Sequence, residues 1–385
     1  MNYDFDTVID RHGTNSIKWG VYPEDVLPLW VADTDFAAAP PIVERIKKRI
    51  AHPIYGYTMD SPELVSAVQD RMRERYDWEI NREDIVLVPG IVSGFNFASR
   101  AICEPGESVI FQTPIYPPFF AAPANNQLRT ITNPLVFDRE QETYRIDFED
   151  FEQKIQKDTR LFILCNPHNP VGRVFSPEEL TQLGEICCQK DLIICSDEIH
   201  SDIIYNGHKH TPIAALSPEI ARRTITLIAP SKTFNIAGFS CSVAIIQNPD
   251  LRERFTAACK GFCSGVSFIA QEAGAAAYTE CEDWLTQMNR YLEGNRDFLL
   301  DTIAREMPAV HTNPIEATYL AWLDCSDAGL PDKPHAFFLE NAKVGLNDGA
   351  AFGTGYEKFV RLNFGTPRKI LAEALERMSR ALKKV

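Results

Sequence analysis

The chain has 385 residues, of which 45% are apolar and 24% charged, and its formal net charge is -14 at pH 7. The acidic balance argues against a nucleic-acid partner, because binding to phosphates relies on clustered Lys and Arg. The N-terminal stretch lacks the basic start and apolar core of a signal peptide, and nowhere is an apolar run long enough to span a bilayer, so we expect neither secretion nor membrane insertion.

Short apolar runs alternate with helical stretches in the first two thirds of the chain. Six runs rich in Ile, Val and Leu predict strands that are buried on both faces of a sheet. They span residues 85–88, 108–112, 161–165, 192–196, 224–228 and 243–246. Amphipathic segments lie between them, such as 176–190, where Ser176 and Glu179 supply a capping box. This alternation predicts an α/β domain with a mostly parallel sheet and helices on both faces.

The last hundred residues have a different pattern. A long polar helix is predicted over 282–307 and a closing helix over 368–383, with strands over 318–324 and 360–364 between them. This order is typical of a smaller α+β domain, which the N-terminal arm is expected to join. We therefore expect a large domain over residues 45–285 and a small domain made of 1–44 and 286–385.

Polar residues that directly follow the strands are candidate ligand groups, because parallel sheets bind ligands beyond the carboxyl ends of their strands. After the first run, Gly90 leads into a helix whose free N–H groups suit a phosphate, although such a glycine is more often only a turn. After the third run, NPHNPVG directs the Asn169 amide toward a cleft; a turn with satisfied asparagines is the alternative.

Two charged residues follow the later strands. Asp197 comes at the end of the fourth run, where a buried carboxylate needs a cationic partner, and a structural ion pair is the alternative. Lys232 follows the fifth run in IAPSKTFNIAGF, a stretch without other charges. A desolvated lysine is an amine nucleophile that forms an imine with an aldehyde, whereas a surface lysine is the alternative. With Gly90 and Asn169, these residues form the set of groups that pyridoxal phosphate requires.

Several motifs carry a resemblance to a known family. The motifs YGYT, NPHNPVG, SDEIH, SKTFNIAG and VRLNFG resemble those of fold-type I pyridoxal-phosphate enzymes of the class I/II aminotransferase superfamily. RHGTNSIKWG, PLWVADTDF and ATYLAWLD resemble the cystathionine β-lyase branch called MalY/PatB. The resemblance implies pyridoxal 5′-phosphate as cofactor and α,β-elimination from cystathionine or a related cysteine S-conjugate, which releases a thiol, pyruvate and ammonia. An amino-acid aminotransferase and a regulatory protein that binds a transcription factor are the alternatives.

The same resemblance assigns roles around the cofactor. It implies that Lys232 binds the cofactor as an imine and moves the substrate Cα proton, that Asp197 pairs with the pyridine nitrogen, and that Asn169 hydrogen-bonds the ring hydroxylate. His200 stands near that hydroxylate, where many aminotransferases have a tyrosine. The residues implied to hold the phosphate are Gly90, Ile91, Val92 and Ser231. An arginine that many relatives carry for the phosphate is replaced by Ser240.

The resemblance also concerns the substrate and a partner subunit. It implies that Arg361 binds the substrate α-carboxylate through a bidentate pair, with Asn169 and Tyr116 beside it. Tyr116 is expected to stack on the cofactor ring, or else to be a core aromatic. Tyr57 matches a catalytic tyrosine that reaches the phosphate of the neighbouring subunit, so a homodimer with shared active sites is implied.

The cysteines and histidines predict no metal site. The ten cysteines are scattered and form no zinc-type CxxC pairs, so we expect reduced thiols in a cytoplasmic protein. His208 and His210 lack a third ligand nearby, and a zinc site needs three or four.

Overall fold

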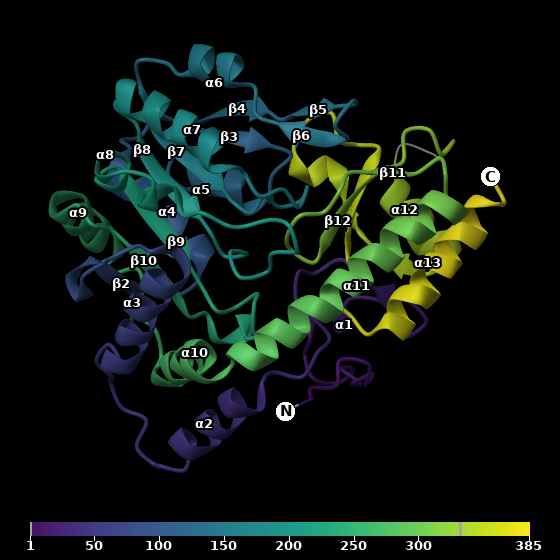
Figure 1. Cartoon of the computed structure of the whole chain (residues 1–385), viewed down its shortest axis with the longest axis horizontal. Helices are drawn as coiled ribbons and strands as arrows, with labels where there is room; N and C mark the ends of the chain where they lie inside the picture. The colour runs from purple at the N-terminus through teal and green to yellow at the C-terminus, as the bar shows by residue number, and fades with distance from the viewer. Residues whose placement is uncertain (1, 331–332) are drawn as a thin grey trace.

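The computed structural model describes residues 2–330 and 333–385, and its central element is a seven-stranded sheet (Figure 1). In spatial order its strands are β2 (Ile85–Val88), β10 (Ser242–Ile245), β9 (Thr224–Ile228), β8 (Ile193–Asp197), β7 (Thr159–Cys165), β3 (Ser108–Thr113) and β4 (Arg129–Pro134). Strand β10 is antiparallel to both of its neighbours, and the other four pairs are parallel. The mostly parallel sheet is therefore confirmed, and every strand except β10 ends at the same edge.

All six predicted runs are strands of this sheet, with bounds that differ from the prediction by at most two residues. Strand β4 was not predicted. It lies at the edge of the sheet, and its residues Arg129 and Thr130 are exposed, so it has no continuous apolar run that would mark it as a buried strand.

Helices cover both faces of the large sheet, as predicted, because successive side chains of a strand point to opposite sides. Ile163 of β7 packs in one core with helices α4 (Ile91–Ile102), α5 (Pro118–Asn125) and α9 (Pro249–Cys259). Phe162 and Leu164 pack in another core with α6 (Phe148–Lys154), α7 (Pro177–Gln189) and α8 (Pro218–Ala221). Helix α7 begins with the predicted capping box between Ser176 and Glu179.

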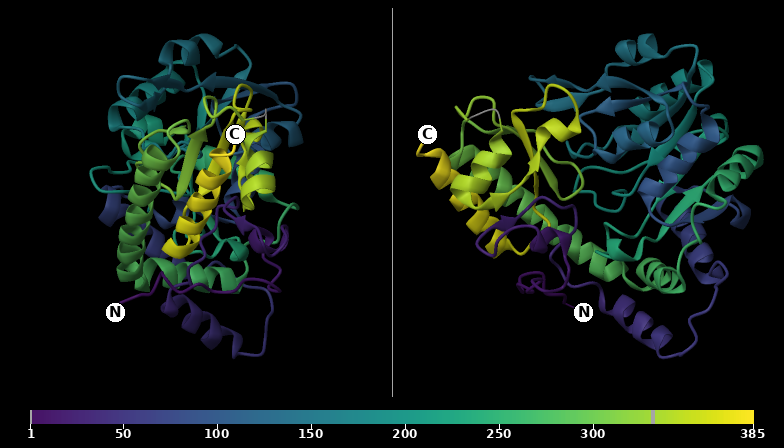
Figure 2. Two further views of the ribbon diagram at one scale, coloured as in Figure 1. Left: turned by 90° about the vertical axis from the view of Figure 1, so that its right-hand side faces the viewer. Right: turned by 180° about the vertical axis from the view of Figure 1, so that it is seen from behind.

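The C-terminal part forms a second sheet. Its antiparallel strands are, in order, β11 (His311–Thr312), β12 (Leu320–Asp324), β15 (Phe359–Asn363) and β14 (Asn347–Asp348). Helices α11 (Glu282–Glu306) and α12 (Pro334–Ala342) contact this sheet, and α13 (Arg368–Leu382) packs against both of them. Figures 1 and 2 show the long helix α11 running from beside α10 (Phe268–Glu280), next to the large sheet, to the small sheet, where it packs against α13.

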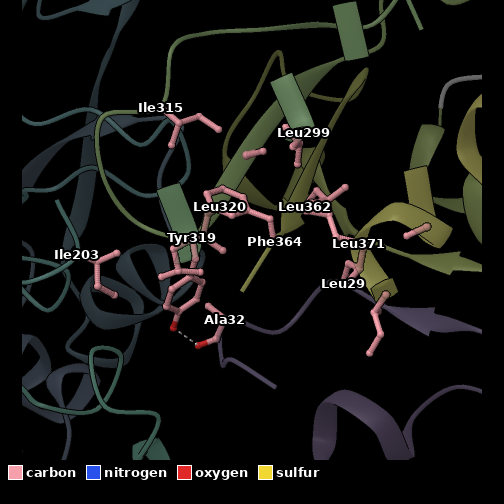
Figure 3. Packing of buried hydrophobic residues seen from close by; sticks show 14 of the residues in the cluster. Leu29, Ala32, Ile203, Leu299, Ile315, Tyr319, Leu320, Leu362, Phe364 and Leu371 are labelled. Atoms are coloured by element: carbon pink, nitrogen blue, oxygen red, sulfur yellow. Dashed lines mark hydrogen bonds between the residues drawn. The ribbon is translucent and has the colours of Figure 1, made fainter. Parts of the chain in front are cut away.

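The N-terminal arm pairs with the C-terminal part in a separate two-stranded sheet. Strand β1 (Leu27–Pro28) pairs in parallel with β13 (Val344–Gly345), and Leu29 lies in one hydrophobic core with Leu362 and Leu371 (Figure 3). The division into a large domain over 45–285 and a small domain made of 1–44 and 286–385 stays a prediction.

The remaining elements are short or peripheral. They are α1 (Ile17–Gly20), α2 (Pro40–Ile50), α3 (Pro62–Tyr76), the hairpin β5 (Val136–Asp138) and β6 (Thr143–Arg145), and the 3-10 turns Arg82–Asp84, Ile213–Ala215, Ala237–Phe239 and Gly349–Phe352. Within residues 2–330 and 333–385, no helix has both the length and the apolar character needed to cross a membrane.

Candidate active site

A cavity of about 280 Å³ lies beyond the carboxyl ends of β2, β7, β8 and β9. Nine of the residues singled out in the sequence line it: Gly90, Ile91, Val92, Tyr116, Asn169, Asp197, His200, Ser231 and Lys232. The other lining residues are Ala32, Pro89, Ser93, Phe95, Cys165, Ile199, Ala237 and Ser240. A larger hollow of about 580 Å³ borders α2 and α10, and none of these residues lines it. The smaller cavity is therefore the candidate active site.

Lys232 presents its amine to this cavity. The Nζ atom donates a hydrogen bond of 2.6 Å to the carbonyl of Ala32, which also accepts one of 3.0 Å from the hydroxyl of Tyr319 (Figure 3). Removal from bulk water, together with the nearby Arg361 guanidinium, lowers the pKa of Lys232 to about 8. About a tenth of this amine is therefore unprotonated at pH 7, far more than for an ordinary lysine, and the unprotonated form is the nucleophile.

Asp197 is the last residue of β8 and is buried. Its carboxylate accepts a hydrogen bond of 3.1 Å from the backbone N–H of Ile199, but within the described residues no Lys or Arg forms an ion pair with it. Burial, with a smaller effect from Glu198, raises its pKa to about 7. The structural ion pair that was the alternative for Asp197 is thus absent from the described part of the chain, and the carboxylate is suited to a cationic ligand.

The first turn of α4 forms the side of the cavity where the phosphate was expected. Gly90 has φ +94°, a left-handed conformation that favours glycine. Its own N–H donates to the carbonyl of Val88 at 2.9 Å. Helix α4 has no side-chain cap, so the first-turn N–H groups of Ile91, Val92 and Ser93 remain for an anion.

Arg361 of β15 is a buried cation beside this cavity. Its guanidinium donates to Asn169 Oδ1 at 3.0 Å, to Asn347 Oδ1 at 2.6 Å and to the carbonyl of Trp30 at 3.1 Å. It stands over the ring of Phe352, and its side chain is 3% exposed. Burial lowers its pKa to about 10, so it stays charged at neutral pH. No carboxylate of the described chain pairs with it, which makes it suited to a carboxylate ligand.

The two aromatic rings predicted near the cofactor also line the cavity. Burial raises the pKa of Tyr116. His200 is buried with its Nδ1 atom lacking any partner, and burial, with Lys232 and Arg361, lowers its pKa to about 3. The imidazole of this lining residue is therefore neutral, and its Nδ1 is a buried polar atom without a partner in the described chain.

Tyr57 is the one predicted site residue that lies away from the others. Its side chain is fully exposed and outside the cavity, in the segment between α2 and α3. Tyr55, two residues earlier, is held within its own chain: its hydroxyl donates to the carbonyl of Ile50 and its ring stacks on Phe268. The two tyrosines are thus distinguished, and only Tyr57 is free to reach beyond its own chain.

Three contributors to the site were not predicted as such. Ala32 and Trp30 act through backbone carbonyls, which carry no side-chain signal, and Asn347 comes from a two-residue strand. The only hint to Ala32 in the sequence was its place in the motif PLWVADTDF. No cluster of three His, Cys, Asp or Glu residues able to hold a metal occurs in the described ranges, and the ten cysteines are free thiols.

Comparisons with known proteins show which family and structures this chain is similar to. Residues 24–378 match the family model described as aminotransferase class I and II. The chain is 41% identical to cystathionine β-lyase PatB of Bacillus subtilis (strain 168), over 98% of this chain and 100% of that protein. Its structure is similar to that of cystalysin from Treponema denticola, which contains a pyridoxal 5′-phosphate cofactor, with a TM-score of 0.95 and 35% identity over all of both chains. It is also similar to the C-S lyase from Staphylococcus hominis bound to pyridoxal phosphate and the inhibitor L-cycloserine, with a TM-score of 0.94 and 34% identity over 99% of each chain.

Proposed function

This chain belongs to the class I and II aminotransferase family, and from that premise we propose that it is a pyridoxal-phosphate-dependent carbon–sulfur β-lyase. It cleaves the Cβ–S bond of cystathionine or a related cysteine S-conjugate and releases a thiol, pyruvate and ammonia. The observation that carries the proposal is a single cavity with an amine of lowered pKa and a carboxylate without a cationic partner, beside a guanidinium without an anionic one.

The residues present fit the cofactor. Lys232 supplies the amine for its aldehyde, Asp197 the carboxylate for its ring nitrogen, and the first turn of α4 the N–H groups for its phosphate. The unpartnered Nδ1 of buried His200 gives independent support, because a buried polar atom in a native site needs a partner and a polar ligand supplies one. When bound, pyridoxal phosphate withdraws electrons from the substrate Cα and so makes its proton acidic.

The side chains then perform three tasks. Arg361 binds and orients the substrate carboxylate through its two-nitrogen fork. Lys232 takes the proton from Cα and passes a proton to the sulfur that leaves as the thiol, which suits an amine with a pKa of about 8. Asp197, held by the Ile199 N–H, keeps the ring nitrogen protonated. When the Cβ–S bond breaks, its electron pair stays on sulfur, and the remaining enamine takes up water to give pyruvate and ammonia.

The relatives favour the lyase over the two alternatives considered from the sequence. The protein that is 41% identical over the full length is named a cystathionine β-lyase, and the similar structures include a C-S lyase. A decisive assay incubates the holoenzyme with cystathionine and measures pyruvate and free thiol. The lyase proposal predicts equal amounts of both without an added keto acid, whereas turnover that depends on a keto acid and releases no thiol would contradict it.

We also propose a homodimer in which Tyr57 of each subunit completes the site of the other. The support is its full exposure outside its own cavity, in contrast to Tyr55. Mixing the inactive variants Tyr57→Ala and Lys232→Ala under exchange conditions tests this, because a hybrid dimer has one site with both native residues. About a quarter of the native activity is expected to return in the mixture. No return of activity, with exchange verified by mass, would refute shared sites.

A further inference from the structure

Residues 30–35, which we call the strap, contact the site through backbone carbonyls. The carbonyl of Trp30 accepts from Arg361 at 3.1 Å, and that of Ala32 accepts from Lys232 at 2.6 Å. A shift of this backbone therefore moves the groups proposed to bind the substrate carboxylate and to carry the reacting amine. No side chain of the strap makes these two contacts, so its shape must be fixed by other interactions.

The N-terminal arm provides such interactions as a cluster of charges. Lys18 is fully buried, and its amine donates to Asp35 at 2.7 Å and to the backbone carbonyl of Asp33 at 3.2 Å. Arg11 bridges both carboxylates, at 2.8 Å from Asp33 and 2.7 Å from Asp35. Trp19 donates its indole N–H to Asp35 at 2.8 Å. Two cations of the arm thus oppose two anions of the strap, and we call these four charged residues the arm clamp.

The arm clamp lies next to the reacting amine. Lys18 and Lys232 donate to the carbonyls of Asp33 and Ala32, which are consecutive in the chain. A buried ammonium is costly unless it is paired, and Lys18 is paired with Asp35 at 2.7 Å and with Asp33 at 3.6 Å. The field of Asp33 does reach Lys232 and raises its pKa, against the larger lowering by burial.

We propose that Lys18 and Arg11 are positioning residues: they hold the strap so that it receives Lys232 and Arg361, and they cancel the charges of Asp33 and Asp35. This role goes beyond the proposed lyase function and presupposes it. A neutral residue in place of either cation leaves a net negative charge near Lys232, which favours the protonated amine. A neutral residue in place of either carboxylate does the opposite.

Other titratable and charged groups face Lys232 from the elements around it, and all stay constant in the variants below. They are Arg361 of β15, Asp197 of β8, His200 after β8, Tyr116 after β3 and Tyr319 before β12.

The test compares Lys18→Met, Arg11→Gln and Asp35→Asn in the holoenzyme. The visible absorbance of the bound cofactor, titrated with pH, reports the protonation of the Lys232 nitrogen. Lys18→Met and Arg11→Gln are expected to move the midpoint up and Asp35→Asn to move it down. Each shift should be roughly 0.8–1.2 pH units, the effect of one charge on the order of 10 Å away at an effective dielectric of about 20–30. Arg11 is partly exposed, so Arg11→Gln keeps the test valid if Lys18→Met does not fold.

Two further variants separate positioning from general stability. The double variant Lys18→Met with Asp35→Asn restores the charge balance and is expected to return the midpoint toward that of the unmodified enzyme. Arg252→Met breaks the ion pair to buried Asp84, before β2 and away from the cavity, and is expected to lower thermal stability without moving the midpoint.

The outcomes are distinct from those that test the lyase proposal. Opposite shifts for the cation and carboxylate variants, with a raised KM, support the arm clamp. Equal midpoints in all variants, or shifts in the same direction, would refute it even if every variant were less stable. If the unmodified protein bound no pyridoxal phosphate, the proposed function itself would fail, before any variant was compared.

Discussion

Asp197 is a buried carboxyl whose ionisation is expected to destabilise the protein until a cation binds to it. Burial raises its pKa in the folded chain to about 7, compared with about 3.9 in an unfolded chain. A carboxyl with a raised folded pKa holds its proton more tightly in the folded state. The free energy of unfolding of the cofactor-free protein should therefore fall as the pH rises from about 4 to 7. Asp197→Asn removes this titration and keeps the shape of the side chain.

The size of the effect follows from the two pKa values. Ionisation of Asp197 costs the folded state about 1.5 kcal/mol at pH 5 and about 4 kcal/mol at pH 8. The asparagine variant avoids this cost, although its buried amide loses about 1–3 kcal/mol at every pH if it lacks an acceptor. The stability of the variant relative to the unmodified protein should thus increase by about 2–3 kcal/mol between pH 5 and pH 8.

Urea unfolding of the cofactor-free proteins at several pH values measures this difference. Asp301→Asn, at an exposed position of α11, serves as the control and should show no such trend. With pyridoxal phosphate bound, the order should reverse, because the carboxylate then pairs with a cation and the amide does not. A stability difference that does not change with pH would show that Asp197 is not desolvated as described.

Three more predictions concern other parts of the molecule. Arg361→Lys keeps the charge but loses the guanidinium fork that contacts Asn169 and Asn347, so kcat/KM should fall by about 10–100-fold, mainly through a higher KM. Steady-state assays measure this, and an unchanged KM would contradict the proposed role of Arg361. The rate at which cofactor-free protein takes up pyridoxal phosphate should rise about tenfold per pH unit below pH 8 and then level off, because only unprotonated Lys232 reacts. Stopped-flow absorbance measures this rate, and a rate that does not change with pH would contradict a pKa of about 8 for Lys232. Gly349→Ala should lower the free energy of unfolding, measured with denaturant, by about 1–3 kcal/mol or more, because a Cβ there overlaps the carbonyl oxygens of Tyr356 and Phe359. Gly20→Ala, where the space is open, should lower it far less, and equal losses in the two variants would contradict this packing.

The sequence predicted the large sheet well because its signals are local. Each of the six runs is rich in Ile, Val and Leu, so the run itself marks a buried strand, whichever strands lie beside it. The polar residue after each strand could likewise be located, because parallel strands end at one edge. Strand β4 escaped prediction because an edge strand needs no continuous apolar run.

Contacts between distant parts of the chain were beyond such reasoning. The amine of Lys232 meets the carbonyl of a residue 200 positions earlier, and a backbone carbonyl has the same chemistry in every residue. Sequence patterns also could not show that the N–H of Gly90 donates a hydrogen bond to the carbonyl of Val88. Nor could they show that Tyr55 is held within its own chain while Tyr57 is exposed.

The sequence by itself determined which residues are candidates for the proposed chemistry: an amine, a carboxylate, an amide and a guanidinium, each in a motif of recognisable spacing. Only the tertiary structure decided their electrostatic state. Burial lowers the pKa of Lys232 and raises that of Asp197, and the N-terminal arm brings Lys18 and Arg11 against the strap. The physical reason is that a pKa depends on how much water and which charges surround a group, and those surroundings come from segments far away in the chain.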